Sequence, residues 1–232
     1  MTITRISAVD GTLVEGAHRF EVEQAAQIAA FWEAATAANA TLFNGRTVLG
    51  DSWKEEGGVF RFTCRAVNYA TLLCWLQTPA KASAPASALH IYASPAIIGS
   101  DGRVIMGRMA SHTANSGRVY FPSGSMELCD FPDGRADFQF NMRREVLEET
   151  GIDLNDSEVE DGYLLYRANG IAALTRNFRF SRTSGEILES INAFIRSGRS
   201  DDELSGVLSF GPGEIDPGMP GHMKSYMENF WG

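Results

Sequence analysis

Cysteine is scarce in this sequence, which has three among its 232 residues: Cys64, Cys74 and Cys129. Their spacing matches no metal-binding motif, and an odd, low number is typical of a reducing compartment. The first residues, MTITRISAVDG, lack an apolar signal-peptide core, and no apolar run reaches the length needed to span a membrane. We therefore expect a cytoplasmic protein without a membrane partner.

Basic residues are also few: the sequence has 20 Lys and Arg and 29 Asp and Glu, which gives a formal net charge of −9. A protein that binds nucleic-acid backbones needs a basic surface, so we expect no nucleic-acid partner. An acidic protein can still act on an anion where a bound metal ion supplies local positive charge. The length and the 44% hydrophobic content suit one large globular domain or two modest ones.

Motifs of several enzyme classes are missing from the sequence. It has no Gly-x-Ser-x-Gly elbow for a Ser-His-Asp hydrolase, and its GSDG and PSGS turns lack the P-loop lysine. The histidines show no metal-ligand spacing, so we expect them at the surface or in packing roles: His18, His90, His112 and His222.

The first third of the chain predicts a small α+β domain. Apolar residues at helical spacing predict helices over 22–39 and 68–77. Between them, residues 46–67 predict two strands around a Glu-Glu-Gly-Gly turn. The segment 78–87 is rich in Ala, Pro and Ser and is the best linker candidate. We therefore predict an N-terminal domain over 1–80 and a second domain over 81–232.

The second domain has a mixed pattern of strands and helices. A hairpin around GSDG is predicted over 88–109, and a strand that runs into a glycine turn over 118–125. Further β-rich segments are predicted at 162–170, 171–180 and 203–210. Helices are predicted at 137–150, 184–198 and 220–231. We expect Gly151 to close the helix 137–150 and Ser184 to cap the next one. The fold class is thus α/β.

The stretch RREVLEETGI, residues 143–152, carries the strongest chemical signal. Glu145, Glu148 and Glu149 share one side of a helix, where like charges repel. A solvated acidic face is the ordinary explanation of a glutamate triplet. A set of five fixed residues and two apolar positions would occur by chance in roughly one in 10⁵ chains of this size. The fixed residues are Arg144, Glu145, Glu148, Glu149 and Gly151, and the apolar ones are Val146 and Ile152. Dense carboxylate oxygens suit a hard divalent cation such as Mg²⁺, which would turn the repulsion into attraction.

These residues resemble the helical half of the Nudix box, in which Arg-Glu-apolar-any-Glu-Glu-any-Gly-apolar follows a glycine loop. The resemblance implies an α/β/α sandwich with a mixed sheet and hydrolysis of nucleoside diphosphates linked to another group, with Mg²⁺ or Mn²⁺. It implies that Glu148 and Glu149 are the principal metal ligands and that Glu145 is a further ligand or the base for the attacking water. Arg144 would orient the glutamates by ion pairing.

The loop half departs from the Nudix pattern. Gly124 stands where the box begins, and Asp130 stands where the family usually has Glu. Thirteen residues separate Asp130 from Arg144 instead of seven, which indicates an insertion around FPDGR. The resemblance implies that the carbonyl of Ser123 binds metal. Glu127 falls where many members have a mid-loop Glu, and the role of Asp130 stays open.

Other site residues and the substrate are less well defined. Many family members use a further loop carboxylate, for which Glu203, beside Asp202, is the best candidate and Glu186 a weaker one. Tyr120 and Phe121 would stack on a nucleobase, or else serve as buried aromatics. The layout before the box resembles the members that cleave UDP-glucose. We therefore expect a nucleoside diphosphate sugar as substrate, with ADP-ribose or a dinucleotide as the alternative.

Two other classes remain open. A Nudix-fold protein that has lost turnover would bind a nucleotide as a sensor. An acidic helix without metal would instead form a surface for a protein partner. The N-terminal domain would help close over the substrate, or serve as a scaffold or a homodimer contact.

Overall fold

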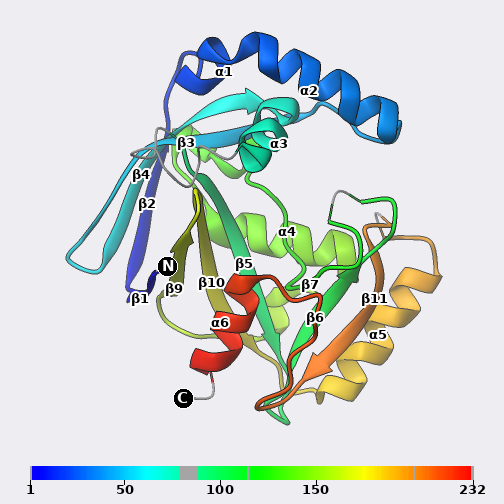
Figure 1. Ribbon diagram of the computed structural model, residues 1–232. Helices are drawn as coiled ribbons and strands as arrows, with labels where there is room; N and C mark the ends of the chain where they lie inside the picture. The colour runs from blue at the N-terminus through cyan, green and yellow to red at the C-terminus, as the bar shows by residue number, and fades with distance from the viewer. Residues whose placement is uncertain (1, 79–87, 114, 201, 231–232) are drawn as a thin grey trace. The chain divides into compact units, whose positions relative to one another are not determined.

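The computed structural model describes residues 2–78, 88–113, 115–200 and 202–230 (Figure 1). The chain divides into two compact units whose segments alternate along the sequence. Unit 1 consists of residues 1–93, 125–141 and 162–174, and unit 2 consists of 94–124, 142–161 and 175–232. The described strands form an eight-stranded and a three-stranded sheet, and helices occur in both units. The predicted α/β fold class is confirmed.

The predicted domain boundary at residue 80 lies outside the described residues. The same is true of the predicted linker 78–87, apart from Thr78, which caps the preceding helix. The division into domains over 1–80 and 81–232 therefore stays a prediction.

The three-stranded sheet of unit 1 is mixed. Strands β3 (Arg46–Glu56) and β4 (Val59–Asn68) form the predicted antiparallel pair, joined through Gly57 and Gly58. These glycines have φ angles of 59° and 74°, a region that glycine enters without steric cost. Strand β2 (Ala8–Leu13) pairs with β4 in the parallel direction. Also in this unit, β1 (Thr2–Ile6) pairs antiparallel with β9 (Tyr163–Ala168).

The predicted helix 22–39 is two helices in the structure, α1 (Arg19–Glu23) and α2 (Ala25–Ala38). The chain leaves helical geometry at Gln24, where φ is −111° and ψ is 20°. Helix α1 begins early because the His18 side chain accepts a hydrogen bond from the Phe20 amide at 3.1 Å. Helix α3 (Tyr69–Gln77) matches its prediction. A buried cluster in this unit contains Phe20, Ile28, Leu49, Val67 and Trp75.

Strand β6 (Val104–Met109) is the common partner of several strands in unit 2. It pairs antiparallel with β5 (His90–Ile98), β11 (Leu204–Phe210) and the short β7 (Val119–Tyr120). Strand β10 (Ile171–Arg179) pairs with β8 (Glu158–Val159). The predicted hairpin around GSDG is present. Strands β5 and β10 and helix α4 each contain residues of both units.

Helix α5 (Ser184–Arg196) corrects one predicted cap. Its N-cap is Thr183, not Ser184, because the Thr183 hydroxyl accepts from the Glu186 amide while the Glu186 carboxylate accepts from the Thr183 amide at 2.7 Å. The predicted last helix is α6 (Gly221–Phe230), and Trp231 lies outside the described residues. None of the helices that the structure describes has both the length and the apolar character needed to cross a membrane.

Candidate active site

Helix α4 (Phe138–Thr150) presents the glutamates because its opposite side is anchored in the core. Phe138, Met142 and Val146, spaced four apart, are at most 3% exposed. The helix ends at Gly151, whose φ is 69° and whose amide donates to the Leu147 carbonyl at 2.9 Å. The predicted glycine closure is confirmed.

The three glutamates of α4 differ in their access to solvent. The Glu148 side chain is 52% exposed and that of Glu145 is 12% exposed, whereas Glu149 is 2% exposed as a residue. A carboxylate as buried as that of Glu149 costs free energy unless a cation or hydrogen-bond donors compensate its charge. The acidic side of α4 is therefore not the solvated helix face of the ordinary explanation.

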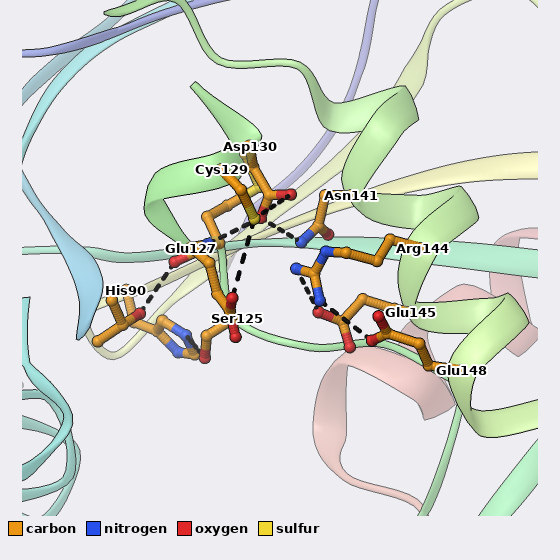
Figure 2. Close-up of polar contacts among 11 residues, drawn as sticks. His90, Ser125, Glu127, Cys129, Asp130, Asn141, Arg144, Glu145 and Glu148 are labelled. Carbon is orange, nitrogen blue, oxygen red and sulfur yellow. Dashed lines mark hydrogen bonds and ion pairs between the residues drawn. The ribbon is translucent and has the colours of Figure 1, made fainter. Parts of the chain in front are cut away.

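Arg144 binds two of these carboxylates (Figure 2). Its guanidinium lies 2.8 Å from Glu145 Oε1 and 3.2 Å from Glu148 Oε2, and its side chain is only 18% exposed. A planar guanidinium offers several donors in a fixed geometry, so one arginine can fix both carboxylates. This ion pairing relieves the repulsion between the carboxylates of the helix, and the role of Arg144 in a reaction stays a prediction.

The glycine loop meets the glutamate helix within unit 2. A Cβ atom added to Gly124 would overlap the carboxylate of Glu145. Gly124 is not among the glycines with positive φ, so it is required for this close approach and not for the left-handed turn that glycine also permits. Beside it, the Ser123 hydroxyl donates to the Phe121 carbonyl at 2.9 Å. The two halves of the predicted box are thus in contact despite the longer spacing.

Asp130 has a structural role within unit 1. It is fully buried, and its Oδ2 accepts from the Glu127 amide at 2.7 Å and from Asn141 Nδ2 at 2.8 Å (Figure 2). These bonds tie the end of the loop to the first turn of α4. Asn141 could not be predicted as a site residue, because a single Asn in an amphipathic helix looks like a solvent-facing residue until its partner is known.

The insertion packs on strand β2, also within unit 1. Arg135 forms an ion pair with Asp10 and donates to Thr12 Oγ1 at 3.0 Å, and the Ala136 amide donates to the Gly11 carbonyl at 3.0 Å. The inserted residues between the glycine loop and α4 therefore bind strand β2, and α4 remains a regular helix.

The remaining predicted residues have separate environments. Phe121 is fully buried and packs edge-to-face on Tyr226, with ring centroids 5.0 Å apart, which corrects the expectation that it stacks on a nucleobase. Tyr120 is partly buried in β7. Glu203 is exposed directly before β11, and its carbonyl accepts from the Ala110 amide at 2.8 Å. The roles of Tyr120 and Glu203 stay predictions.

Glu186 is engaged in the cap of α5. The hydrogen bond from the Thr183 amide, together with that from its hydroxyl, lowers the pKa of this carboxyl. Glu186 lies in the first turn of α5, where a negative charge is favourable for the helix dipole.

The glutamates fit a hard divalent cation by their donor chemistry. Carboxylate oxygens, together with a backbone carbonyl such as that of Ser123, are the ligands that Mg²⁺ and Mn²⁺ prefer. Within the described part of the chain, no three His, Cys, Asp or Glu side chains form a group arranged to hold a metal ion. In the structure, Arg144 instead holds the carboxylates of Glu145 and Glu148.

Comparisons with known proteins find matches only among solved structures. Neither a family model nor a curated protein matches the sequence. Among solved structures, the MutT protein from Methanosarcina mazei Go1 is 18% identical over 61% of this chain and 92% of its own, with a TM-score of 0.43. DR0079 from Deinococcus radiodurans is 13% identical over 63% of this chain and 86% of its own, with a TM-score of 0.43. The chemistry of the site must therefore be argued from the residues.

Proposed function

We propose that this protein is a Nudix-type hydrolase that cleaves the pyrophosphate of a nucleoside diphosphate derivative with a divalent metal ion. One observation carries the proposal: a complete REVLEETGI helix whose Arg144 binds Glu145 and Glu148, with Gly124 packed on Glu145. A structural acidic surface requires neither the buried Glu149 nor a glycine pressed against a carboxylate.

The glutamates of α4, Arg144 and Ser123 would each have a separate role in hydrolysis. Glu148, Glu149 and the Ser123 carbonyl would hold Mg²⁺ or Mn²⁺, with Glu145 as a further ligand or as the base. A bound metal ion supplies Lewis acidity toward the pyrophosphate oxygens and lowers the pKa of water. Glu145 accepts the proton of the water that attacks phosphorus, and Arg144 keeps that carboxylate oriented. Phosphoryl transfer depends mainly on such positioning and charge neutralisation.

The substrate proposal is supported by sequence features alone. A nucleoside diphosphate sugar such as UDP-glucose ranks first because of the layout before the box. ADP-ribose and dinucleotides rank second. Tyr120 would contact the substrate beside the loop, and Glu203 would add a carboxylate from outside the box. A sensor without turnover would be favoured by the departures from the Nudix pattern at Asp130 and in the insertion, but both make structural contacts in unit 1.

A panel of nucleoside diphosphate compounds tests the proposal. Purified protein is incubated with UDP-glucose, ADP-ribose and a dinucleotide, with Mg²⁺ or with chelator, and the products are separated by chromatography. We expect a nucleoside monophosphate as product, only with metal. Thermal stabilisation by a nucleotide without product would favour the sensor. Metal-independent cleavage, or neither product nor stabilisation, would contradict the proposal.

A further inference from the structure

The loop that approaches Glu145 is joined to the buried ring of Phe121 by a short turn. Strand β7 pairs with β6 through Tyr120 and Gly107, and Phe121 follows directly and is fully buried. Its carbonyl accepts from the Ser123 hydroxyl at 2.9 Å, and Gly124 then meets Glu145. A Cβ atom at Gly124 would overlap the Glu145 carboxylate, so the loop packs closely on it, and only two residues separate Phe121 from Gly124. We therefore expect a displacement of Phe121 to change the position of the loop beside that carboxylate.

Helix α6 supplies the surface on which Phe121 rests. Tyr226 is 4% exposed, and its ring packs perpendicular to that of Phe121 at 5.0 Å. Edge-to-face packing of this kind adds stability beyond the apolar area that is buried. The Tyr226 hydroxyl donates to Asn177 Oδ1 on β10 at 2.8 Å, so the ring is fixed at both ends.

A closed ring of contacts holds Tyr226 in place. Asn177 Nδ2 donates to Glu160 Oε2 at 2.8 Å, and Arg179 Nε lies 2.5 Å from Glu160 Oε1. The Arg179 guanidinium lies 5.6 Å from the centroid of the Phe230 ring, which stacks on Tyr226 at 5.3 Å. All of these residues belong to unit 2. Burial raises the pKa of Tyr226, so its hydroxyl remains a hydrogen-bond donor.

We propose that Tyr226 is a positioning residue that sets the glycine loop against Glu145 through Phe121. Tyr226 does not touch the reacting atoms. Its effect on turnover rests on the proposed function, because the loop carbonyl of Ser123 is a metal ligand only if that proposal is correct. Its effect on the loop itself does not depend on any activity.

Hydrogen–deuterium exchange of the loop tests the inference without activity. The variants are Tyr226→Leu, which removes the ring, and Tyr226→Phe, which keeps the ring against Phe121 and loses the bond to Asn177. Ile191→Ala is the matched control, because Ile191 is fully buried in α5 of the same unit and its truncation also lowers the melting temperature. We expect faster exchange of the amides of Ser123, Gly124 and Ser125 in Tyr226→Leu, a smaller change in Tyr226→Phe, and none in Ile191→Ala.

Metal dependence provides the second measurement. We expect Tyr226→Leu to raise the Mn²⁺ concentration for half-maximal binding roughly threefold to tenfold, measured by electron paramagnetic resonance. Its kcat would fall on the order of tenfold through loss of positioning. Unchanged loop exchange in Tyr226→Leu, or an equal increase in Ile191→Ala, overturns the inference. A wild-type protein without turnover contradicts the proposed function alone, because loop exchange still decides the role of Tyr226.

Discussion

Glu149 is the most buried of the three glutamates on helix α4. It is 2% exposed although it is ionisable, and it lies one helical turn beyond Glu145. Carboxylates are seldom this buried unless they are compensated, which is why Glu149 is the best single position for testing the site.

The variant Glu149→Gln keeps the side-chain shape and removes the charge. We expect turnover to fall roughly a hundredfold or more, because a neutral amide is a poor metal ligand and cannot take a proton. The matched control is Glu189→Gln, the same change at an exposed position of α5. Circular dichroism and thermal melting would show that both variants fold. Near-normal Mg²⁺-dependent turnover in Glu149→Gln would refute the assignment of this residue.

His18 is a buried histidine that caps helix α1, and we expect it to make the stability of the fold depend on pH. The imidazole is fully buried, its Nδ1 accepts from the Phe20 amide at 3.1 Å, and its Nε2 lies 3.2 Å from the Gly50 carbonyl. The amide of Phe20 fixes Nδ1 as the unprotonated nitrogen, so Nε2 carries the proton and donates to Gly50. Burial lowers the pKa of His18.

Because the folded pKa is below the unfolded value, the unfolded chain binds the proton first as pH falls. The contribution of His18 is therefore complete above about pH 6.5 and declines below it, by at most about 1.4 kcal/mol per pH unit. Urea unfolding of wild type and His18→Asn between pH 8 and 5.5 checks this, since Asn also caps a helix but does not titrate. We expect the stability difference between them to shrink as pH falls. A difference that is constant across this range would contradict the account of His18.

At the level of elements, the approach of the glycine loop to α4 is the most informative feature. Gly124→Ala places a Cβ atom on the Glu145 carboxylate, so loop or carboxylate must move. We expect a loss of stability of about 1–3 kcal/mol. We also expect a fall in kcat on the order of tenfold or more through misplacement.

The control for Gly124→Ala is Gly206→Ala, because a Cβ atom there meets nothing within 4 Å and its φ is not positive. Both variants are compared by chemical denaturation and by initial rates with Mg²⁺. Equal effects of the two changes would mean that the contact with Glu145 has no special importance.

Elements with strong local patterns could be predicted, and those defined by distant partners could not. Helix α4 followed from its apolar spacing and Gly151, and β3 and β4 from their glycine turn. Strands β1 and β2 were not predicted, because β1 pairs with β9 more than 150 residues away and β2 is short and contains a glycine. The apolar pattern of 22–39 reveals neither the His18 cap that begins α1 nor the break at Gln24.

At the level of the whole molecule, the sequence indicates candidate site residues but not the contacts that support them. The helical half of the box was recognisable because its residues are consecutive. Two supporting contacts could not be predicted. Asp130 and Asn141 lie on either side of the insertion, and Arg135 binds Asp10, which is far away in the sequence. The structure also resolved the alternatives for Phe121, because only packing shows that its ring lies under Tyr226.

The alternation of two units along the chain has a consequence for truncation. Each unit is built from three separate segments, and α4, β5 and β10 contribute to both. Removing residues 1–80 would therefore remove β1, which pairs with β9, and β2, which binds the insertion. Tests of the site are best made in the full chain.

Binding of Mn²⁺ to the free protein tests the central claim, that the acidic side of α4 is a metal site, most directly. Electron paramagnetic resonance would be measured on wild type, Glu148→Gln, Glu149→Gln and the control Glu189→Gln, with Mg²⁺ as competitor. We predict Mn²⁺ binding to wild type and the control, displaced by Mg²⁺, and weaker by at least about tenfold in both α4 variants. Equal Mn²⁺ affinity in all four proteins would contradict the account.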